Sequence, residues 1–171
     1  MKTRIEWIEK YMLDAERMIV EGGPQLEQGL NVLNDLLYDE PGYGSLHNHL
    51  GWAHLYYTLD YELAGVHLRA SIKFQPEFHA PYLHLGTMYY RQGKYGEAIE
   101  ILNVGVSKPF ANKMAMLEMI GQSREMRREY KLAIKVYKEA MLSTLVSGEM
   151  NVYSESIKRC RRKRWSILLS Q

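Results

Sequence analysis

Histidine side chains are the first groups in this sequence that could do chemistry, because imidazole binds metals and titrates near neutral pH. All six lie between positions 47 and 84, and His47 and His49 form a closely spaced pair. Zinc sites add carboxylates or thiols at characteristic spacings such as H-E-x-x-H, and no such spacing occurs here. The pattern therefore favours histidines that pack in the core or contact a partner. It predicts no metal and no cofactor.

Cys160 is the second candidate, since a thiolate is a nucleophile and the neighbouring cations would favour that ionised form. No histidine lies near it in the sequence, and a cysteine on the apolar face of a helix usually acts as a small hydrophobic residue. Residues 21–24 (EGGP) also lack the lysine and the serine or threonine of a phosphate-binding loop. We find no enzyme signature. A single cysteine cannot form an intramolecular disulfide, which fits a reducing compartment.

A run of cations near the carboxyl end is the third candidate, and Trp165 follows it directly. Its members are Lys158, Arg159, Arg161, Arg162, Lys163 and Arg164. Clustered cations beside an aromatic ring suit phosphate contacts and base stacking in a nucleic acid. They equally suit an acidic protein partner, or a solvated helix end stabilised by the helix dipole. The apolar residues 165–169 could fold back, dock a partner or pair two copies as a homodimer.

The overall composition is that of a globular protein with one domain. The 171 residues are 46% hydrophobic and 25% charged, which excludes wholesale disorder. The chain has 22 Lys and Arg against 20 Asp and Glu, so without the six clustered cations the rest carries 16 against 20, a net charge of −4. The amino-terminal residues lack the apolar stretch of a secretory signal, and no apolar run is long enough to span a membrane. These features predict a cytoplasmic protein.

Several features recur with a period of about 35 residues. Apolar-glycine pairs end at Gly51, Gly86 and Gly121, each 35 residues apart. Tyr61, Tyr95 and Tyr130 are each followed three residues later by an alanine. A helix-sized segment lies on each side of the short turn before each tyrosine, so every unit is predicted to be an antiparallel helical hairpin. The glycine and the alanine would lie where the two helices cross most closely.

These residues resemble the tetratricopeptide repeat (TPR), whose unit of about 34 residues has the pattern W-x2-L-G-x2-Y…A-x3-F…P. The unit at 79–110 matches best, the units at 44–76 and 114–145 match well, and a unit at 5–41 is degenerate because it lacks the leading Leu-Gly pair. The resemblance implies a single all-α domain, a right-handed superhelix of about four helix pairs. Residues 148–171 would add a capping helix and the basic tail, since such arrays usually end in a cap.

In TPR proteins the first helix of each unit lines a concave groove. Positions two, six, nine and thirteen of each unit share that face, counting the apolar-glycine pair as seven and eight. The principal groove residues read from this register are His49, Trp52, Tyr56, His84, Thr87, Arg91, Met119, Gln122 and Met126; small or short residues, Ser45, Ala80 and Ala115, occupy position two. Exposed aromatic and methionine side chains commonly mark a binding site, although neighbouring units or the amino-terminal helix could cover them.

The groove composition indicates the kind of partner. Arg91 is the only fixed cation among these groove positions, so the sequence lacks the cation set with which some TPR proteins hold a terminal carboxylate. An apolar or amphipathic segment is therefore the predicted ligand. The resemblance thus implies a non-catalytic adaptor, scaffold or small chaperone that binds a protein or peptide segment. Binding of nucleic acid or an acidic partner through the basic carboxyl-terminal helix is the alternative.

Overall fold

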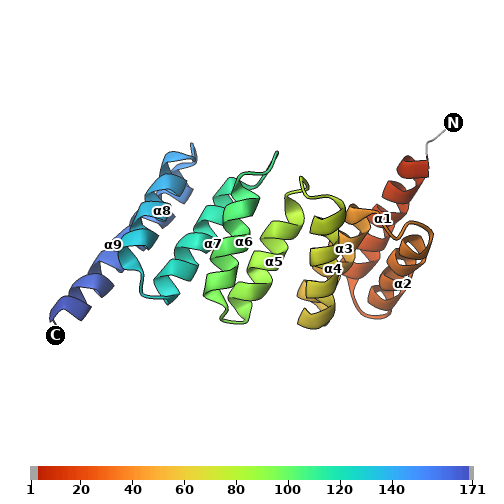
Figure 1. Cartoon of the computed structure of the whole chain (residues 1–171), viewed down its shortest axis with the longest axis horizontal. Helices are drawn as coiled ribbons and strands as arrows, with labels where there is room; N and C mark the ends of the chain where they lie inside the picture. The colour runs from red at the N-terminus through yellow and green to blue at the C-terminus, as the bar shows by residue number, and fades with distance from the viewer. Residues whose placement is uncertain (1–3, 170–171) are drawn as a thin grey trace. The chain divides into compact units, whose positions relative to one another are not determined.

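The computed structural model describes residues 4–169, apart from the side chain of residue 168, and this part of the chain contains helices and no strand (Figure 1). It divides into two compact units, residues 1–85 and 86–171. The first contains α1 (Arg4–Glu21), α2 (Pro24–Asp39), α3 (Gly44–Ala53), the π-helical segment η1 (His54–Thr58) and α4 (Tyr61–Phe74). Helix α5 (Ala80–Arg91) contains the boundary between the units. The second unit continues with α6 (Tyr95–Val106), α7 (Lys113–Met126), α8 (Tyr130–Leu142) and α9 (Ser147–Leu169).

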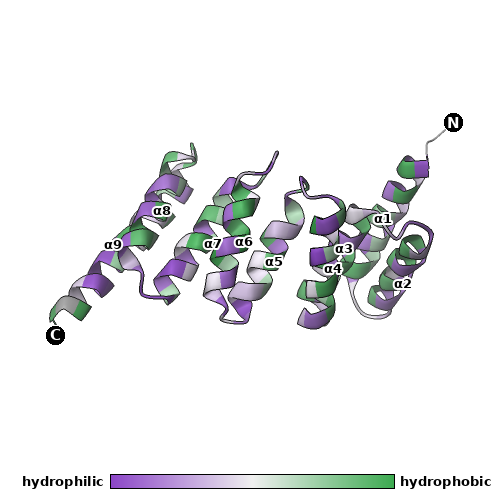
Figure 2. Ribbon diagram, in the orientation of Figure 1, coloured by the Kyte–Doolittle hydropathy of each residue, from purple (hydrophilic) through white to green (hydrophobic). Residues whose placement is uncertain are grey.

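The predicted helical hairpins are present. In the first unit α1 packs on α2 and α3 on α4, and in the second unit α7 packs on α8 and α8 on α9. The turns within the hairpins are two or three residues long, so the paired helices run antiparallel. Each helix carries both hydrophobic and hydrophilic residues along its length (Figure 2). None of the helices in the described part of the chain has the length and apolar character that a membrane crossing requires.

Small residues lie where paired helices approach most closely. A Cβ atom on Gly51 would come within 2.6 Å of Leu68 on α4, and one on Gly86 within 2.5 Å of Leu102 on α6. At Gly121 of α7 it would come within 2.5 Å of the ring of Tyr137 on α8. These distances are well below van der Waals contact, so the repeated glycines set the spacing of the helix pairs.

Each unit has its own apolar core. In the first unit α1, α2 and α3 contribute Ile8, Met12, Ala15, Ile19, Leu33, Leu36, Leu46, Leu50 and Ala53. In the second unit α7, α8 and α9 contribute Leu117, Ala133, Tyr137, Ala140, Tyr153, Ile157 and Cys160. Helix α9 thus covers the last hairpin with its apolar side, as expected of a cap.

The second hairpin contains one extra residue, and the sequence pattern of its unit at 44–76 predicts it in the turn between the two helices. Gly51 and Tyr61 are ten residues apart, whereas the corresponding residues of the next two hairpins are nine apart. That placement was wrong, because the structure accommodates the insertion in η1, a single π-helical turn that extends α3. Insertions of one residue commonly form π-bulges of this kind, often at functional sites. The turn that follows is consequently only two residues long.

The turns of the second, third and fourth hairpins each contain a residue in the same left-handed backbone conformation. Gly93 has φ of 73°, and Leu59 and Arg128, which occupy the same position two residues before the repeated tyrosine, have φ of 57° and 62°. Left-handed residues commonly end helices and are usually glycine, because a Cβ atom makes this conformation costly.

Leu59→Gly should therefore raise the free energy of unfolding by about 1 kcal/mol, since it removes the strain of the left-handed leucine. The leucine side chain is 60% exposed and has little packing to lose. Urea denaturation followed by circular dichroism measures the gain. Leu59→Ala is the matched control, because alanine retains the Cβ atom and should give no gain. Equal stability of the two variants would contradict the strain argument.

Candidate partner-binding faces

Four of the predicted groove residues lie in the first unit: His49, Trp52, Tyr56 and His84, which we call the aromatic face. All four are half-buried. Trp52 packs against the core of the first unit and lies with its ring centroid 4.9 Å from that of Tyr57. The rings of Tyr56 and His84 meet edge to face at 5.7 Å. The aromatic rings are thus held in place by their neighbours while part of their surface remains accessible.

Helix α1 adds a carboxylate to this face that the sequence analysis missed. The Nε2 atom of His49 lies 3.8 Å from Oε2 of Glu16, and its Nδ1 atom lies 2.9 Å from the carbonyl oxygen of Ser45. Because a carbonyl oxygen only accepts hydrogen bonds, Nδ1 carries the proton in the neutral ring. A protonated His49 would also direct its Nε2–H group towards Glu16.

The His84 side chain on the aromatic face is uncharged at physiological pH. Burial, followed by the nearby His49 and His79, lowers the pKa of His84 to about 4. The imidazole is therefore neutral at physiological pH. A neutral ring against Tyr56 suits an apolar ligand better than an acidic one.

The other five predicted groove residues lie in the second unit: Thr87, Arg91, Met119, Gln122 and Met126, which we call the methionine face. The structure brings two of them together, since the hydroxyl group of Thr87 donates to the sulfur of Met119 at 3.6 Å. The amide of Gln122 donates to Oε1 of Glu118 at 3.1 Å. Met126 is 53% exposed and Arg91 is also exposed. Only Thr87 is buried, so the face retains accessible methionine surface.

Three of the remaining histidines form a packed group. The Nδ1 atoms of His47 and His67 are 3.1 Å apart, and the ring of His54 stacks on that of His67. Nε2 of His47 donates to the carbonyl oxygen of Pro41 at 3.0 Å, so in a neutral His47 the Nδ1 atom accepts and His67 donates. In the part of the chain that the structure describes, no group of three or more His, Cys, Asp or Glu side chains has the arrangement of a metal site.

Acidification should destabilise the first unit through His67. Burial, and then repulsion from His47 and His54, lowers its pKa from 6.5 to about 4. The unfolded chain therefore binds more protons between those values, so the stabilising contribution is present above pH 6.5 and is lost as the pH falls towards 4. After allowance for partial solvent exposure, the loss from pH 7 to pH 5 should be about 1 kcal/mol. Urea denaturation of wild type and of His67→Gln at both pH values measures this loss. The prediction would be contradicted if the difference in stability between the two proteins did not change with pH.

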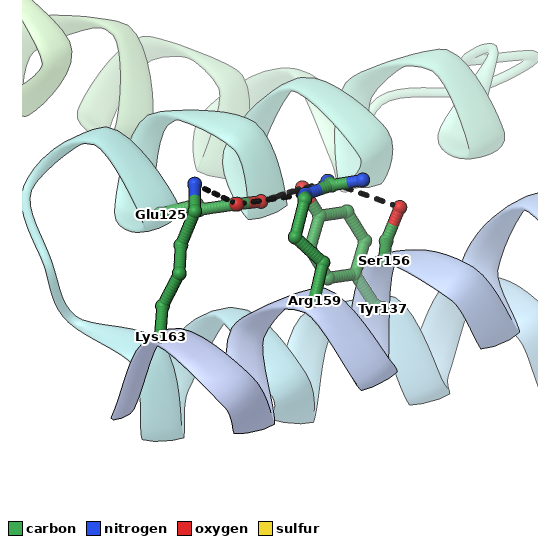
Figure 3. A network of polar contacts seen from close by, with 5 residues as sticks. All are labelled: Glu125, Tyr137, Ser156, Arg159 and Lys163. Atoms are coloured by element: carbon green, nitrogen blue, oxygen red, sulfur yellow. Dashed lines mark hydrogen bonds and ion pairs between the residues drawn. The ribbon is translucent and has the colours of Figure 1, made fainter. Parts of the chain in front are cut away.

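The basic run near the carboxyl end is partly neutralised by ion pairs (Figure 3). Glu125, whose side chain is only 6% exposed, accepts from Nε and Nη2 of Arg159 at 2.8 Å and from Nζ of Lys163 at 2.7 Å. The hydroxyl group of Tyr137 donates to the same carboxylate at 3.3 Å. The Arg159 and Lys163 cations hold the pKa of Glu125 at about 2, so it stays ionised. Glu125 therefore links α7, α8 and α9.

The other four cations of the run have different surroundings. Lys158 pairs with Glu155 on the same helix at 2.7 Å, in an exposed contact. The side chains of Arg161, Arg162 and Arg164 are exposed and form no ion pair with any residue that the structure describes. The run is therefore divided between structural cations and cations that remain open to solvent.

Cys160 belongs to the core of the second unit. Burial and the nearby Glu125 carboxylate raise the pKa of its thiol to about 11. The expectation that surrounding cations would favour a thiolate was wrong, because Arg159 and Lys163 are paired with Glu125. The thiol is protonated at neutral pH and packs as a small apolar group.

This arrangement of helix pairs is that of TPR-like proteins. A Podosopora anserina protein whose TPR-like repeats are nearly identical to one another aligns with 97% of this chain. The alignment covers 90% of that protein's own chain, at a TM-score of 0.75 and 14% identity. MamA of Desulfovibrio magneticus RS-1, from its residue 41 to its end, aligns with 94% of this chain and 93% of its own at a TM-score of 0.69 and 16% identity. A thermophilic TPR protein of Thermus thermophilus aligns with 75% of this chain and 71% of its own, at a TM-score of 0.62 and 16% identity. No protein-family model and no curated protein matches the sequence. The predicted resemblance to TPR repeats and the all-α fold class are thus confirmed at the level of the fold.

Proposed function

We propose that this protein is a non-catalytic interaction module that binds an apolar or amphipathic segment of a partner protein on its aromatic face. The observation that supports this best is the partial exposure of Trp52 and Tyr56. Each ring is fixed by an aromatic neighbour, Tyr57 or His84, and still presents apolar surface. Rings already fixed lose little entropy on binding, so such residues commonly dominate interface energies.

Charge supports an apolar partner segment over an acidic one. The His84 ring is neutral above a pH of about 4, and the charged group next to the face is the Glu16 carboxylate. An acidic segment would be repelled by Glu16, whereas an amphipathic helix could place apolar side chains on the rings and a cation near Glu16. The methionine face of the second unit offers a further apolar surface for the same class of ligand.

An affinity capture from the source cell tests the proposal. The bait proteins are wild type, Trp52→Ala with Tyr56→Ala, and a matched control, Trp7→Ala with Tyr11→Ala. The control removes another paired tryptophan and tyrosine, 4.7 Å apart on α1, that is exposed and lies outside the aromatic face. We expect a protein that wild type and control recover and the aromatic-face variant loses.

The captured protein is then purified and titrated against each bait. The aromatic-face variant should bind at least about tenfold more weakly, which corresponds to about 1.4 kcal/mol, and circular dichroism should show that it is folded. Equal affinity for all three baits would place the binding surface elsewhere and contradict the proposal.

A further inference from the structure

A pocket of about 350 Å³ lies in the second unit, beside the turn between α7 and α8 and the end of α9. We call it the turn pocket. It is lined by Arg128, Glu129, Tyr130, Lys131, Leu132, Arg164 and Ile167. Tyr130, Leu132 and Ile167 supply apolar surface, and Leu132 is 46% exposed. The turn pocket shares no residue with the aromatic or methionine face.

The charges around the turn pocket are predominantly positive. Its one carboxylate, Glu129, is already paired through both oxygens, with Nη1 of Arg124 at 2.8 Å and Nε of Arg127 at 2.9 Å. The side chains of Arg128, Lys131 and Arg164 form no ion pair with the described residues. An apolar pocket edged by three unpaired cations is complementary to apolar surface flanked by carboxylates.

The backbone at Arg128 supports a role for its side chain in this pocket. Arg128 has φ of 62° at the turn position that glycine, with φ of 73°, occupies in the preceding hairpin at Gly93. A side chain in this conformation costs of order 1 kcal/mol relative to glycine. Strain of this kind is commonly found at functional sites, and the exposed Leu59 shows that this turn position accepts a side chain in the same conformation.

The polar network of Figure 3 fixes the other side of the turn pocket. Lys163 on α9 is held 2.7 Å from Glu125, which lies on the last turn of α7. The next residue along α9 is Arg164, and Ile167 follows one turn later, so this anchor keeps both beside the α7–α8 turn. The pocket wall is therefore positioned before any ligand arrives, which lowers the entropy cost of binding.

We propose that the turn pocket docks a short acidic segment of a partner protein. One apolar side chain of that segment enters between Leu132 and Ile167, and flanking carboxylates pair with Arg128, Lys131 and Arg164. A nucleic acid backbone would use the cations and gain little from the apolar surface, which is why the apolar lining favours a peptide.

Fluorescence anisotropy with labelled peptides tests this proposal. The probe is a peptide in which a Leu-Phe pair is flanked by glutamates on both sides. One comparison peptide has the glutamates replaced by glutamine, another has Leu-Phe replaced by Ser-Ser, and an oligothymidylate represents nucleic acid. We expect the probe to bind at least about tenfold more tightly than any of the three, because each lacks the charge or the apolar side chains.

Variants assign the binding to the turn pocket. Leu132→Ser and Arg164→Ala should each weaken probe binding by about tenfold. Arg161→Ala should change it less than about twofold, because Arg161 carries the same charge on the same helix and does not line the pocket. The Trp52→Ala and Tyr56→Ala variant should bind the probe as wild type does, which separates this proposal from the aromatic face.

Arg128→Gly distinguishes function from structure. It should raise the thermal midpoint, because the strain is removed, and at the same time weaken probe binding several-fold. The proposal would be overturned if Arg128→Gly bound the probe with wild-type affinity, or if Arg161→Ala and Arg164→Ala lost equal affinity. Preferential binding of the oligothymidylate would also overturn it, as would the absence of probe binding at low salt.

Discussion

Glu125→Ala is expected to lower the free energy of unfolding of the second unit by about 2–3 kcal/mol. The carboxylate accepts charge-assisted hydrogen bonds from Arg159 and Lys163 and a further bond from Tyr137, and bonds to charged groups contribute about 1.5–3 kcal/mol each. The two cations are about half exposed and can regain water, so the loss should fall below the range of about 3–5 kcal/mol seen when both charges are buried. Urea denaturation followed by circular dichroism measures the change.

Glu155→Ala is the matched control for this substitution. Glu155 forms an ion pair with Lys158 on the same helix, but both side chains are largely exposed. Exposed pairs contribute little, so the control should change stability by less than about 1 kcal/mol.

The contribution of Glu125 should also disappear as the pH falls from about 4.5 towards 2, because its pKa is lowered to about 2 in the folded protein. Equal effects of the two substitutions would show that Glu125 does not anchor α9.

Gly121→Val is expected to destabilise the second unit by about 3 kcal/mol. The added Cβ atom would lie 2.5 Å from the ring of Tyr137. That ring is fully buried, and its hydroxyl group is bonded to Glu125, so it has no space into which to rotate. Inserting methyl groups into a packed interface costs about 1–3 kcal/mol or more. Thermal and urea denaturation should both report the loss.

Gly148→Val provides the comparison. Gly148 lies in α9, and a Cβ atom there would meet nothing within 4 Å. Valine has a slightly higher helix propensity than glycine, so this variant should be as stable as wild type or slightly more stable. A loss at Gly148 as large as at Gly121 would mean that the effect comes from the helix backbone and not from the contact with Tyr137.

The helical hairpins could be predicted because their signals are local and repeat. The first hairpin looked degenerate since it lacks a glycine on its first helix, yet the structure shows a close approach of its two helices at a glycine on the second. Gly29 on α2 takes the alanine position, and a Cβ atom on it would lie 2.7 Å from the carbonyl oxygen of Ala15 on α1. Gly29 lies 35 residues before Ala64, so the period itself contained the signal.

The two candidate faces could be predicted only in part. The repeat register alone predicts that Trp52 and Tyr56 share one face, and in the structure both are partly exposed. Glu16, His67 and Glu125 were missed because their contacts join helices that are far apart in the sequence: Glu125 meets Arg159 across 34 residues. A glutamate near the end of one predicted helix, followed downstream by a basic run, is the hint that the sequence offered. The strained Arg128 could have been found by comparing the turns, because Gly93 occupies the same position in the preceding hairpin.

Site-specific photocrosslinking tests most directly whether the aromatic face binds a partner. Tyr56 is replaced by p-benzoylphenylalanine in one protein, Tyr11 in a second, and both are irradiated in the source cell. Our account predicts a discrete crosslinked protein from position 56, the same protein that the Trp52→Ala and Tyr56→Ala bait fails to capture, and no such adduct from position 11. Identical adducts from both positions, or none from position 56 when the captured partner is present, would contradict it.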